Sequence, residues 1–311
     1  MRYPQAVLVT CEVPWDEKFK LLEDAFRREV QGAIASGFRH IYVFGTAGEG
    51  YAVDMPRFRD IVVIFREETR APEITAQVGV IDLSTARIVE RLGFAHEQGF
   101  RVFQISLPSW GALNDGEVVK FFRDVCGTFP DSRFLHYNLP RAKRELTAAD
   151  YRRVADEVPN LAATKNTGRS IYEVRRLMRV VPEIQHFFGE GQFPVGCLFG
   201  ECSLLSSFGA LFPAQTLEFF ECGRTRQFDK LLPLWTRYLD VIDDFLDATR
   251  GKSLIDGAYD KMIARLGGVE MPLRLLSPYE SFSEEVVESV RKTFEEKHGD
   301  WMRTRVPVKP S

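Results

Sequence analysis

The chain has 311 residues, of which 45% are hydrophobic and 27% are charged, and its formal net charge is −3. This composition is typical of a soluble globular protein. It shows neither the basic excess of a nucleic-acid-binding protein nor a polybasic run suited to a membrane surface. The length fits two ordinary domains or one large α/β barrel, so length alone does not set the number of domains.

Features that report on location favour the cytoplasm. The first residues, Met1–Gln5, lack the long apolar core of a signal peptide, and no apolar run approaches the length of a membrane span. The cysteines have no C-x-x-C pairing, as expected for reduced thiols that pack in a core rather than for a disulfide frame or a zinc site. They are Cys11, Cys126, Cys197, Cys202 and Cys222.

Short apolar or β-rich runs recur along the first two thirds of the chain and predict eight strands. In chain order they are Ala6–Thr10, His40–Phe44, Ile74–Val78, Val102–Ser106, Arg133–Tyr137, Leu161–Lys165, Ile184–Phe188 and Leu204–Ser207. The segments between them have helical periodicity, with N-cap signatures at Asn114 and Thr147 and terminating glycines at Gly37 and Gly99. Eight strands alternating with helices predict a (β/α)8 TIM barrel.

The competing architecture is a doubly wound open sheet. Such a sheet normally has a glycine-rich phosphate turn after its first strand, and Thr10–Pro14 is not one. No strand is predicted beyond Pro213, where the helical segments are Leu217–Arg250, Leu254–Leu266 and Ser283–Lys297. We interpret them as the eighth barrel helix and a C-terminal helical extension, which divides the chain into a barrel of residues 1–225 and an extension of residues 226–311.

Lys165 ends the sixth predicted strand, at the edge where catalytic groups of such barrels gather. If the amine is buried there, desolvation lowers its pKa from about 10.4 toward neutrality. A neutral amine can attack a carbonyl, so Lys165 is a candidate for a Schiff base. The alternative is a lysine that extends from the strand end into solvent.

The strand pattern also predicts the neighbours of Lys165. Side chains alternate along a strand, so an inward Lys165 would place Ala163 and Leu161 inside the barrel as well. On the fifth strand Tyr137 would face inward beside Lys165, whereas His136 would face the helices as a packed residue.

Three motifs at the ends of predicted strands two, five and six resemble, in order and spacing, those of the dihydrodipicolinate synthase / N-acetylneuraminate lyase family. They are Gly45-Thr46-Ala47-Gly48-Glu49, Tyr137-Asn138-Leu139-Pro140 and Thr164-Lys165-Asn166-Thr167-Gly168. The stretch Gly267–Pro278 is similar to the family's tail, so the resemblance covers nearly the whole chain. It implies a TIM barrel, usually a homotetramer, that binds pyruvate or another 2-oxo acid as a lysine imine.

The resemblance implies a role for each of these motifs. Lys165 as a protonated imine would be an electron sink, and Tyr137 would move protons; the alternative for Tyr137 is a buried tyrosine whose hydroxyl only satisfies a backbone group. Thr46 and Ala47 would bind the substrate carboxylate, and Glu49 would hold the loop by accepting its amides. The remaining substrate-binding residues implied are Gly189, Leu205 through its carbonyl, and Ser206.

The chain departs from the family's synthases where the second substrate binds. Ala47 replaces a second threonine, and Ala142 stands where an arginine would grip an acidic aldehyde. The loop Leu107–Gly111 lacks the tyrosine that a neighbouring subunit would supply. Trp110, Arg141 and Glu190 are therefore only candidate contacts for the second substrate. On an extended loop, Arg141 would project away from the side on which Ala142 lies.

These features favour a lyase or aldolase acting on a 2-oxo acid. The alternatives are dihydrodipicolinate synthase, which joins pyruvate to aspartate semialdehyde, and a retired barrel that only binds a small acid. No cluster with metal-ligand spacing occurs at the strand ends, so neither a metal nor another cofactor is expected. Glu190 would repel a phosphate and accept hydrogen bonds from hydroxyl groups, which predicts a non-phosphorylated, hydroxylated or aromatic partner. A homotetramer or homodimer is expected.

Overall fold

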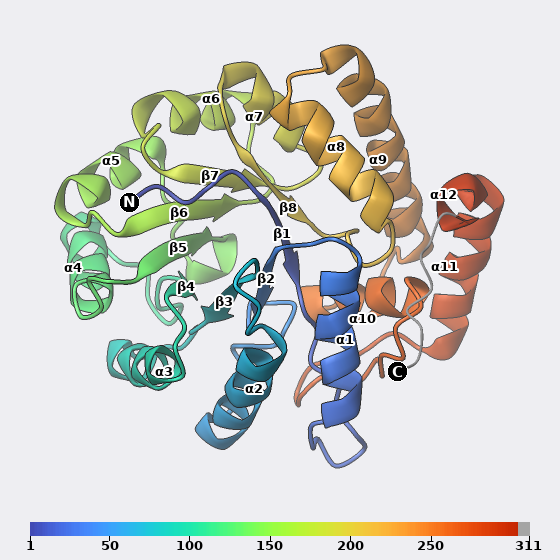
Figure 1. The fold of residues 1–311 in the computed structure, drawn as a ribbon, viewed down its shortest axis with the longest axis horizontal. Helices are drawn as coiled ribbons and strands as arrows, with labels where there is room; N and C mark the ends of the chain where they lie inside the picture. The colour runs from blue at the N-terminus through green and yellow to red at the C-terminus, as the bar shows by residue number, and fades with distance from the viewer. Residues whose placement is uncertain (304–311) are drawn as a thin grey trace.

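The computed structural model describes residues 1–303 and contains one closed barrel of eight parallel strands in sequential order, as predicted (Figure 1). The TIM-barrel prediction is therefore confirmed, with each strand end within one or two residues of its expected place. The strands are β1 (Val7–Thr10), β2 (His40–Val43), β3 (Thr75–Gly79), β4 (Val102–Ile105), β5 (Arg133–Asn138), β6 (Leu161–Asn166), β7 (Gln185–Phe188) and β8 (Ser203–Ser206).

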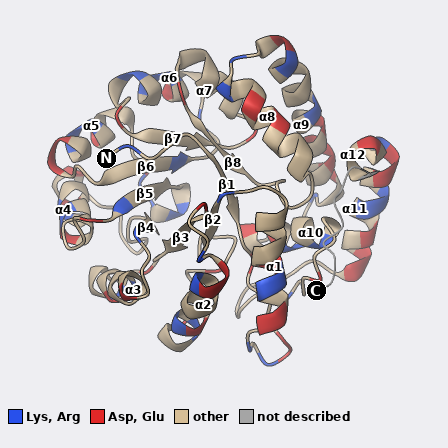
Figure 2. Cartoon of the chain, viewed as in Figure 1, with Lys and Arg blue, Asp and Glu red and all other residues tan. Residues whose placement is uncertain are grey.

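Helices surround the barrel, and the last of them form a separate layer beside α1 (Figure 1). The helices are α1 (Glu23–Ala35), α2 (Met55–Glu68), α3 (Thr85–Glu97), α4 (Asp115–Cys126), α5 (Ala148–Glu157), α6 (Ile171–Val180), α7 (Phe193–Phe199), α8 (Pro213–Arg224), α9 (Phe228–Ala248), α10 (Asp256–Leu266), α11 (Glu284–Lys297) and α12 (Gly299–Arg303). Lys, Arg, Asp and Glu are interspersed along the outer helices (Figure 2). Within residues 1–303, no helix combines the length and apolar character that crossing a bilayer needs.

Helix boundaries follow from local sequence in most places. The predicted N-caps Asn114 and Thr147 each form a reciprocal capping box with an acidic residue three positions on. The single helix predicted from Leu217 to Arg250 is wrong, because α8 and α9 are separated at residues 225–227. Arg226 has a left-handed φ of 56°, which interrupts the helix three residues after Gly223, in the last turn of α8.

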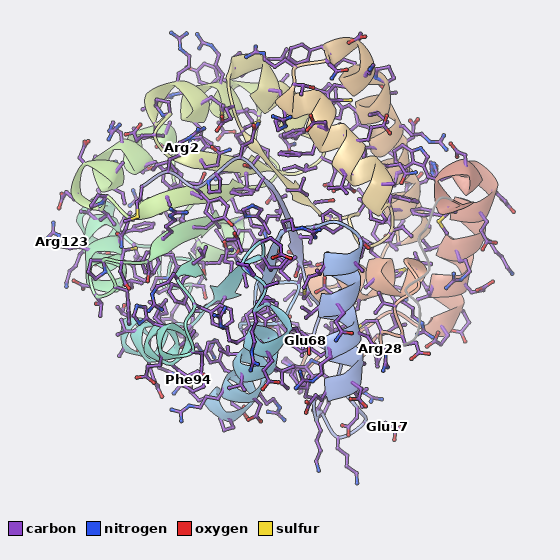
Figure 3. The ribbon with its side chains drawn as sticks, viewed as in Figure 1. Arg2, Glu17, Arg28, Glu68, Phe94 and Arg123 are labelled. Carbon is purple, nitrogen blue, oxygen red and sulfur yellow. The ribbon has the colours of Figure 1, made fainter. Side chains whose placement is uncertain are left out.

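Side chains fill the barrel from within and separate it from the helices, whereas Arg123 and Glu17 point outward (Figure 3). Leu135 and Ala163 belong to the inner cluster, as predicted, but Leu161 lies in the outer core between strands and helices. The reason is an irregularity between β5 and β6: Phe134 pairs with Leu161, and the next residue, Leu135, pairs with Ala163. One extra residue in β6 reverses the alternation, so the prediction that Leu161 faces inward is wrong.

A buried ion pair connects the C-terminal helices to the barrel. Lys261 of α10 lies 2.9 Å from the Glu49 carboxylate, and both side chains are fully buried. Glu49 also accepts hydrogen bonds from the Leu276 amide, at 2.6 Å, and from the Trp15 indole, at 2.5 Å. Glu49 is thus structural, as expected, but its partners come from Trp15, Lys261 and Leu276 rather than from amides of its own loop. The division at residue 225 stays a prediction, and residues 304–311 of the predicted extension lie outside the described residues.

Candidate active site

A cavity of about 210 Å³ lies at the carboxyl ends of the barrel strands, and we call it the lysine cavity. Most of the residues predicted for the site line it: Lys165, Tyr137, Thr46, Ala47, Leu205 and Ser206. They come from four strand ends, and a parallel barrel brings all such ends to one face. The lining also includes residues that the sequence did not indicate: Thr10, Tyr42, Thr167, Ser207, Asp256 and Asp260.

Lys165 lines this cavity and is only 4% exposed. Its ammonium nitrogen donates to the Tyr42 hydroxyl at 3.1 Å and lies 3.8 Å from the centre of the Tyr137 ring. Burial lowers the pKa of Lys165 to about 8, and the carboxylates of Asp260 and Asp256 oppose this shift. About one tenth of the amine is therefore neutral at pH 7, far more than for an ordinary lysine, and the neutral form is the one that attacks a carbonyl.

Tyr137 lies beside Lys165 because β5 and β6 pair these two residues directly. Burial of the phenol raises the pKa of Tyr137 to about 12. A hydrogen bond with the Thr46 side chain favours the phenolate and so lowers this pKa in part. Tyr137 therefore carries its proton at neutral pH. A phenol in contact with both the amine and a threonine hydroxyl can pass a proton to a bound group and take it back.

The turn after β2 brings Thr46 and Ala47 to the cavity through an unusual backbone. Phe44 and Glu49 have left-handed φ values of 66° and 58°. A Cβ at Gly48 would lie 2.7 Å from the Phe44 amide nitrogen, so this turn requires glycine there. The buried hydrogen bonds of Glu49 hold the same turn, which makes Thr46 a preorganised group.

The predicted residues at the ends of β7 and β8 have different roles. Leu205 and Ser206 reach the lysine cavity, and the Ser206 hydroxyl donates to the buried Glu190 carboxylate at 3.0 Å. The Ser207 amide donates to the same Glu190 oxygen at 2.7 Å. Glu190 thus supports the loop after β8 rather than lining either cavity. Gly189 lies beside open space, where an added Cβ would meet no atom within 4 Å, and its contact with substrate stays a prediction.

The most important residues that the sequence reading missed are two carboxylates from α10. Asp256 and Asp260 are one helical turn apart and both face the lysine cavity. Burial raises the pKa of Asp260 to about 8, Asp256 adds to the shift, and Lys165 opposes it. The i, i+4 spacing in the sequence indicates that the two carboxylates share one helix face. Only the tertiary fold shows that this face meets the barrel mouth.

A second cavity, of about 410 Å³, lies beside the first, and we call it the outer cavity. Thr46 lines both cavities. Arg141 and Ala142 both line the outer cavity, so the prediction that Arg141 projects away from it is wrong. The physical reason is that Pro140–Ala142 forms a 3-10 turn rather than an extended loop, so alternation does not apply.

Arg141 does not enter the outer cavity as a free cation. Its guanidinium makes two parallel hydrogen bonds to the Asp256 carboxylate, at 2.9 and 2.7 Å. Trp110 is 83% exposed and lines neither cavity. The Lys143 ammonium donates to the Trp110 carbonyl at 2.7 Å and lies 5.8 Å from its ring centre.

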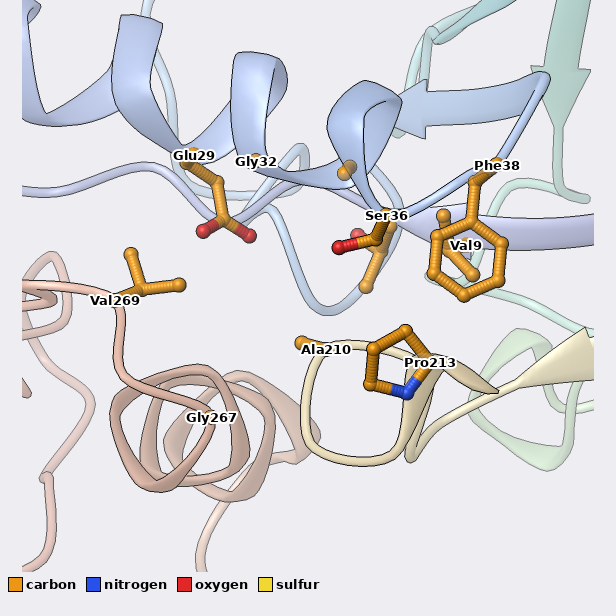
Figure 4. A pocket seen from close by; sticks show the side chains of 11 residues that line it. Val9, Glu29, Gly32, Ser36, Phe38, Ala210, Pro213, Gly267 and Val269 are labelled. Atoms are coloured by element: carbon orange, nitrogen blue, oxygen red, sulfur yellow. The ribbon is translucent and has the colours of Figure 1, made fainter. Parts of the chain in front are cut away.

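Two other buried features lie outside this site. His136 faces the helices, as expected, and its ring nitrogen lies 2.7 Å from the Tyr151 hydroxyl. A cavity of about 40 Å³ lies between α1, the loop before α8 and the end of α10, with Glu29 as its charged group (Figure 4). Since one water occupies roughly 30 Å³ of liquid, this space is too small for an organic substrate.

The chain is similar to known proteins in sequence over almost two thirds of its length and in fold over nearly all of it. N-acetylneuraminate lyase from Citrobacter koseri is 24% identical over 198 residues, which cover 63% of this chain and 66% of that protein. The chain thus spans just under two thirds of the length of the curated relatives that it matches first.

One similar solved structure is YagE, a prophage protein of the dihydrodipicolinic acid synthase family from E. coli K12, in complex with pyruvate. Its TM-score to this chain is 0.84 at 15% identity, and the match covers 94% of this chain and 98% of that one. Dihydrodipicolinate synthase from Aquifex aeolicus has a TM-score of 0.83 at 16% identity, covering 95% and 98%. At these identities the structures show a shared fold. The sequence model of the Dihydrodipicolinate synthetase family matches residues 4–297, and the chain therefore belongs to this family.

Proposed function

We propose that the protein is a class I lyase or aldolase. It forms an imine between Lys165 and pyruvate or a related 2-oxo acid, and it then makes or breaks a carbon–carbon bond. The observation that carries the proposal is the burial of Lys165 beside Tyr137 in a cavity at the barrel mouth, with its pKa lowered to about 8. The solved relative in complex with pyruvate supports the choice of 2-oxo acid.

In this proposal the ionised form of Asp260 accepts the proton of the Lys165 ammonium, because both groups line the lysine cavity and exchange protons as a coupled pair. The neutral amine attacks the 2-oxo carbon to give a carbinolamine. Tyr137 then protonates the departing hydroxyl, so water leaves and a protonated imine remains. That imine withdraws electrons from the neighbouring carbon and stabilises the enamine.

The turn after β2 would hold the substrate carboxylate in place. Thr46 and Ala47 line the lysine cavity on the same side as Tyr137. Backbone amides and one hydroxyl in a glycine-rich turn form a concave donor site suited to a small anion. Ala47 contributes no hydroxyl, so Thr46 would supply the side-chain donor of this turn.

Dihydrodipicolinate synthase is the second candidate, and the position of Arg141 in the outer cavity favours it. An arginine there could meet the carboxylate of aspartate semialdehyde through its paired donors. Its existing ion pair with Asp256 argues against that role, because the guanidinium would have to exchange partners. A third candidate is a barrel that binds a 2-oxo acid without turnover.

We also propose a cytoplasmic homotetramer or homodimer. The 83% exposed ring of Trp110, on the loop after β4 and close to the mouth of the site, is a candidate contact with a second subunit. Sedimentation velocity of the wild type and of Trp110→Ala tests this. A single monomeric species in the wild type would contradict the proposal.

The experiment for the main proposal is a borohydride trap with pyruvate, read by intact mass and peptide mapping. The wild type and the control Lys143→Met should gain one reduced pyruvate adduct, and Lys165→Met should gain none. Lys143 is an exposed lysine near the same loops and is therefore a matched control. An adduct that persists in Lys165→Met would contradict the assignment. An adduct without any turnover of 4-hydroxy-2-oxo acids or condensation with aldehydes would favour the third candidate.

A further inference from the structure

We infer that the outer cavity receives an uncharged aromatic group, so that the second substrate, or the leaving aldehyde, is an aryl aldehyde. This inference rests on the proposed function, because it names the substrate class of the same site. The two cavities are neighbours, because Thr46 lines both. In this inference, a group bonded to the carbon next to the imine extends from Lys165 past Thr46 into the outer cavity.

The lining of the outer cavity is largely apolar. Its aliphatic side chains come from the loops after β3, β4 and β5 and from the residue before α10: Ile81, Leu83, Leu107, Leu139, Ala142 and Ile255. Leu83 is 56% exposed at the rim. When an apolar ligand covers apolar surface of a cavity, binding is stabilised by roughly 25 cal/mol per Å² of surface removed from water.

Two aromatic rings in the outer cavity favour an aryl group over an aliphatic chain. Tyr51 and Tyr279 lie edge to face, with ring centres 4.9 Å apart and an interplanar angle of 79°. Both rings line the outer cavity. Aromatic rings stack or meet edge to face with a further ring at about 4.5–7 Å between centroids, so this pair offers a ready surface for one.

The charged groups of the outer cavity already have partners. Arg141 is held by both oxygens of Asp256. Asp82 lies 3.3 Å from Arg87 and 3.5 Å from the buried Arg91. An aldehyde with its own carboxylate would have to break one of these pairs, whereas an uncharged ring leaves them intact.

One polar group in this lining is unsatisfied. The Tyr51 hydroxyl is buried and has no hydrogen-bond partner among the described residues. A buried hydroxyl without a partner costs about 1–3 kcal/mol. The oxygen is closed to solvent, so a ligand meets it only when the Tyr51 ring shifts toward the outer cavity, and a ligand that supplies an acceptor or donor there is then favoured. A hydroxyl substituent on the aromatic ring would do so.

Cleavage in this inference uses Lys165 and Tyr137. The bond between C3 and C4 of a 4-aryl-4-hydroxy-2-oxobutanoate breaks, and its electron pair moves into the protonated imine to give the enamine. Tyr137, deprotonated after it protonated the departing water, takes the proton of the C4 hydroxyl, and the aryl aldehyde leaves. Tyr137 returns that proton to C3. Water then hydrolyses the protonated imine to pyruvate and the free amine of Lys165, and the proton released restores the Tyr137 phenol. Condensation is the reverse.

The first test compares three aldehydes that differ in the group they would place in the outer cavity: an aromatic ring, a carboxylate or hydroxyl groups. Purified protein is incubated with pyruvate and with benzaldehyde, succinic semialdehyde or glyceraldehyde, and the products are quantified by mass spectrometry. We expect kcat/KM for benzaldehyde to exceed that for each of the other two at least ~10-fold, the usual worth of a ring-sized apolar contact. A preference for succinic semialdehyde or for glyceraldehyde would overturn the inference.

The second test releases Arg141. Asp256→Asn removes the carboxylate partner at constant shape, so the ratio of kcat/KM for succinic semialdehyde to that for benzaldehyde should rise about 10-fold. Effects of this substitution on Lys165 act on both aldehydes and cancel in the ratio. The control Asp243→Asn, an exposed aspartate of α9, should leave the ratio unchanged. An unchanged ratio in Asp256→Asn would contradict the electrostatic part of the inference.

The third test addresses Tyr51. At least one of the three monohydroxybenzaldehydes should react faster than benzaldehyde in the wild type and lose that advantage in Tyr51→Phe. Equal losses for benzaldehyde would contradict the hydrogen bond. A pyruvate adduct on Lys165 together with no preference for aryl aldehydes would reject this inference alone. Absence of the adduct would instead reject the proposed function.

Discussion

The pH dependence of imine formation tests the chemistry of Lys165 most directly. Its pKa of about 8 leaves roughly one tenth of the amine neutral at pH 7, whereas an ordinary lysine near 10.4 leaves only ~0.04%. The buried site therefore holds a few hundred times more nucleophile at neutral pH. The rate of imine formation should rise about tenfold per pH unit below pH 8 and then level off.

The measurement is rapid mixing with pyruvate, a timed borohydride quench and intact mass, at half-unit steps from pH 6 to pH 10. Asp260→Asn removes a carboxylate that raises the pKa of Lys165, so the midpoint should move to lower pH while the plateau rate falls, because the proton acceptor is gone. Asp243→Asn is the matched control and should keep the wild-type curve. A rate that still climbs tenfold between pH 9 and pH 10 would refute the view that burial activates the amine.

Three further outcomes are expected. Tyr137→Phe should still gain the pyruvate adduct but lose ~10²–10⁴-fold in kcat, the usual worth of a positioned proton shuttle, and unchanged turnover would remove Tyr137 from the mechanism. Lys165→Met should raise the free energy of unfolding at pH 7 by about 3 kcal/mol. Lys165→Met stabilises because the lowered pKa of Lys165 makes its protonated form unfavourable in the folded state, and this penalty is fully present below pH 8. The gain in the free energy of unfolding should therefore vanish by about pH 10.5, and a gain independent of pH would contradict this explanation. Lys261→Met should cost about 3–5 kcal/mol in urea unfolding, because it leaves the buried carboxylate of Glu49 without its cation, and a neutral effect would show that this pair does not anchor α10.

The barrel and its central pair were predictable because both depend on local patterns. Apolar runs separated by capped helices set the strand order, and parallel strands bring their carboxyl ends to one face. Once Lys165 and Tyr137 end neighbouring strands with the same parity, their side chains must be adjacent, and the observed register pairs them. The backbone alone then accounts for their contact.

The errors arose where the backbone departs from regular alternation. The extra residue in β6 turns Leu161 outward, and the 3-10 turn at Pro140–Ala142 turns Arg141 toward the outer cavity. The left-handed Arg226 separates α8 from α9, three residues after Gly223. Each depends on one or two backbone dihedral angles that hydrophobic periodicity does not encode, and each leaves the strand order unchanged.

The carboxylates of α10 were missed for a different reason, and this reason bears on function. The three family motifs lie at strand ends, so they predict the imine chemistry, but Asp256 and Asp260 lie on a helix that reaches the barrel only through tertiary packing. The buried pair of Lys261 and Glu49 fixes that helix next to the turn after β2. Asp260 lines the lysine cavity with Lys165, and Asp256 pairs with Arg141, so this one helix contributes carboxylates next to the main cation of each cavity. In the proposed function, the barrel strands would supply the imine chemistry, and this helix would disfavour an acidic second substrate by holding Arg141 in an ion pair.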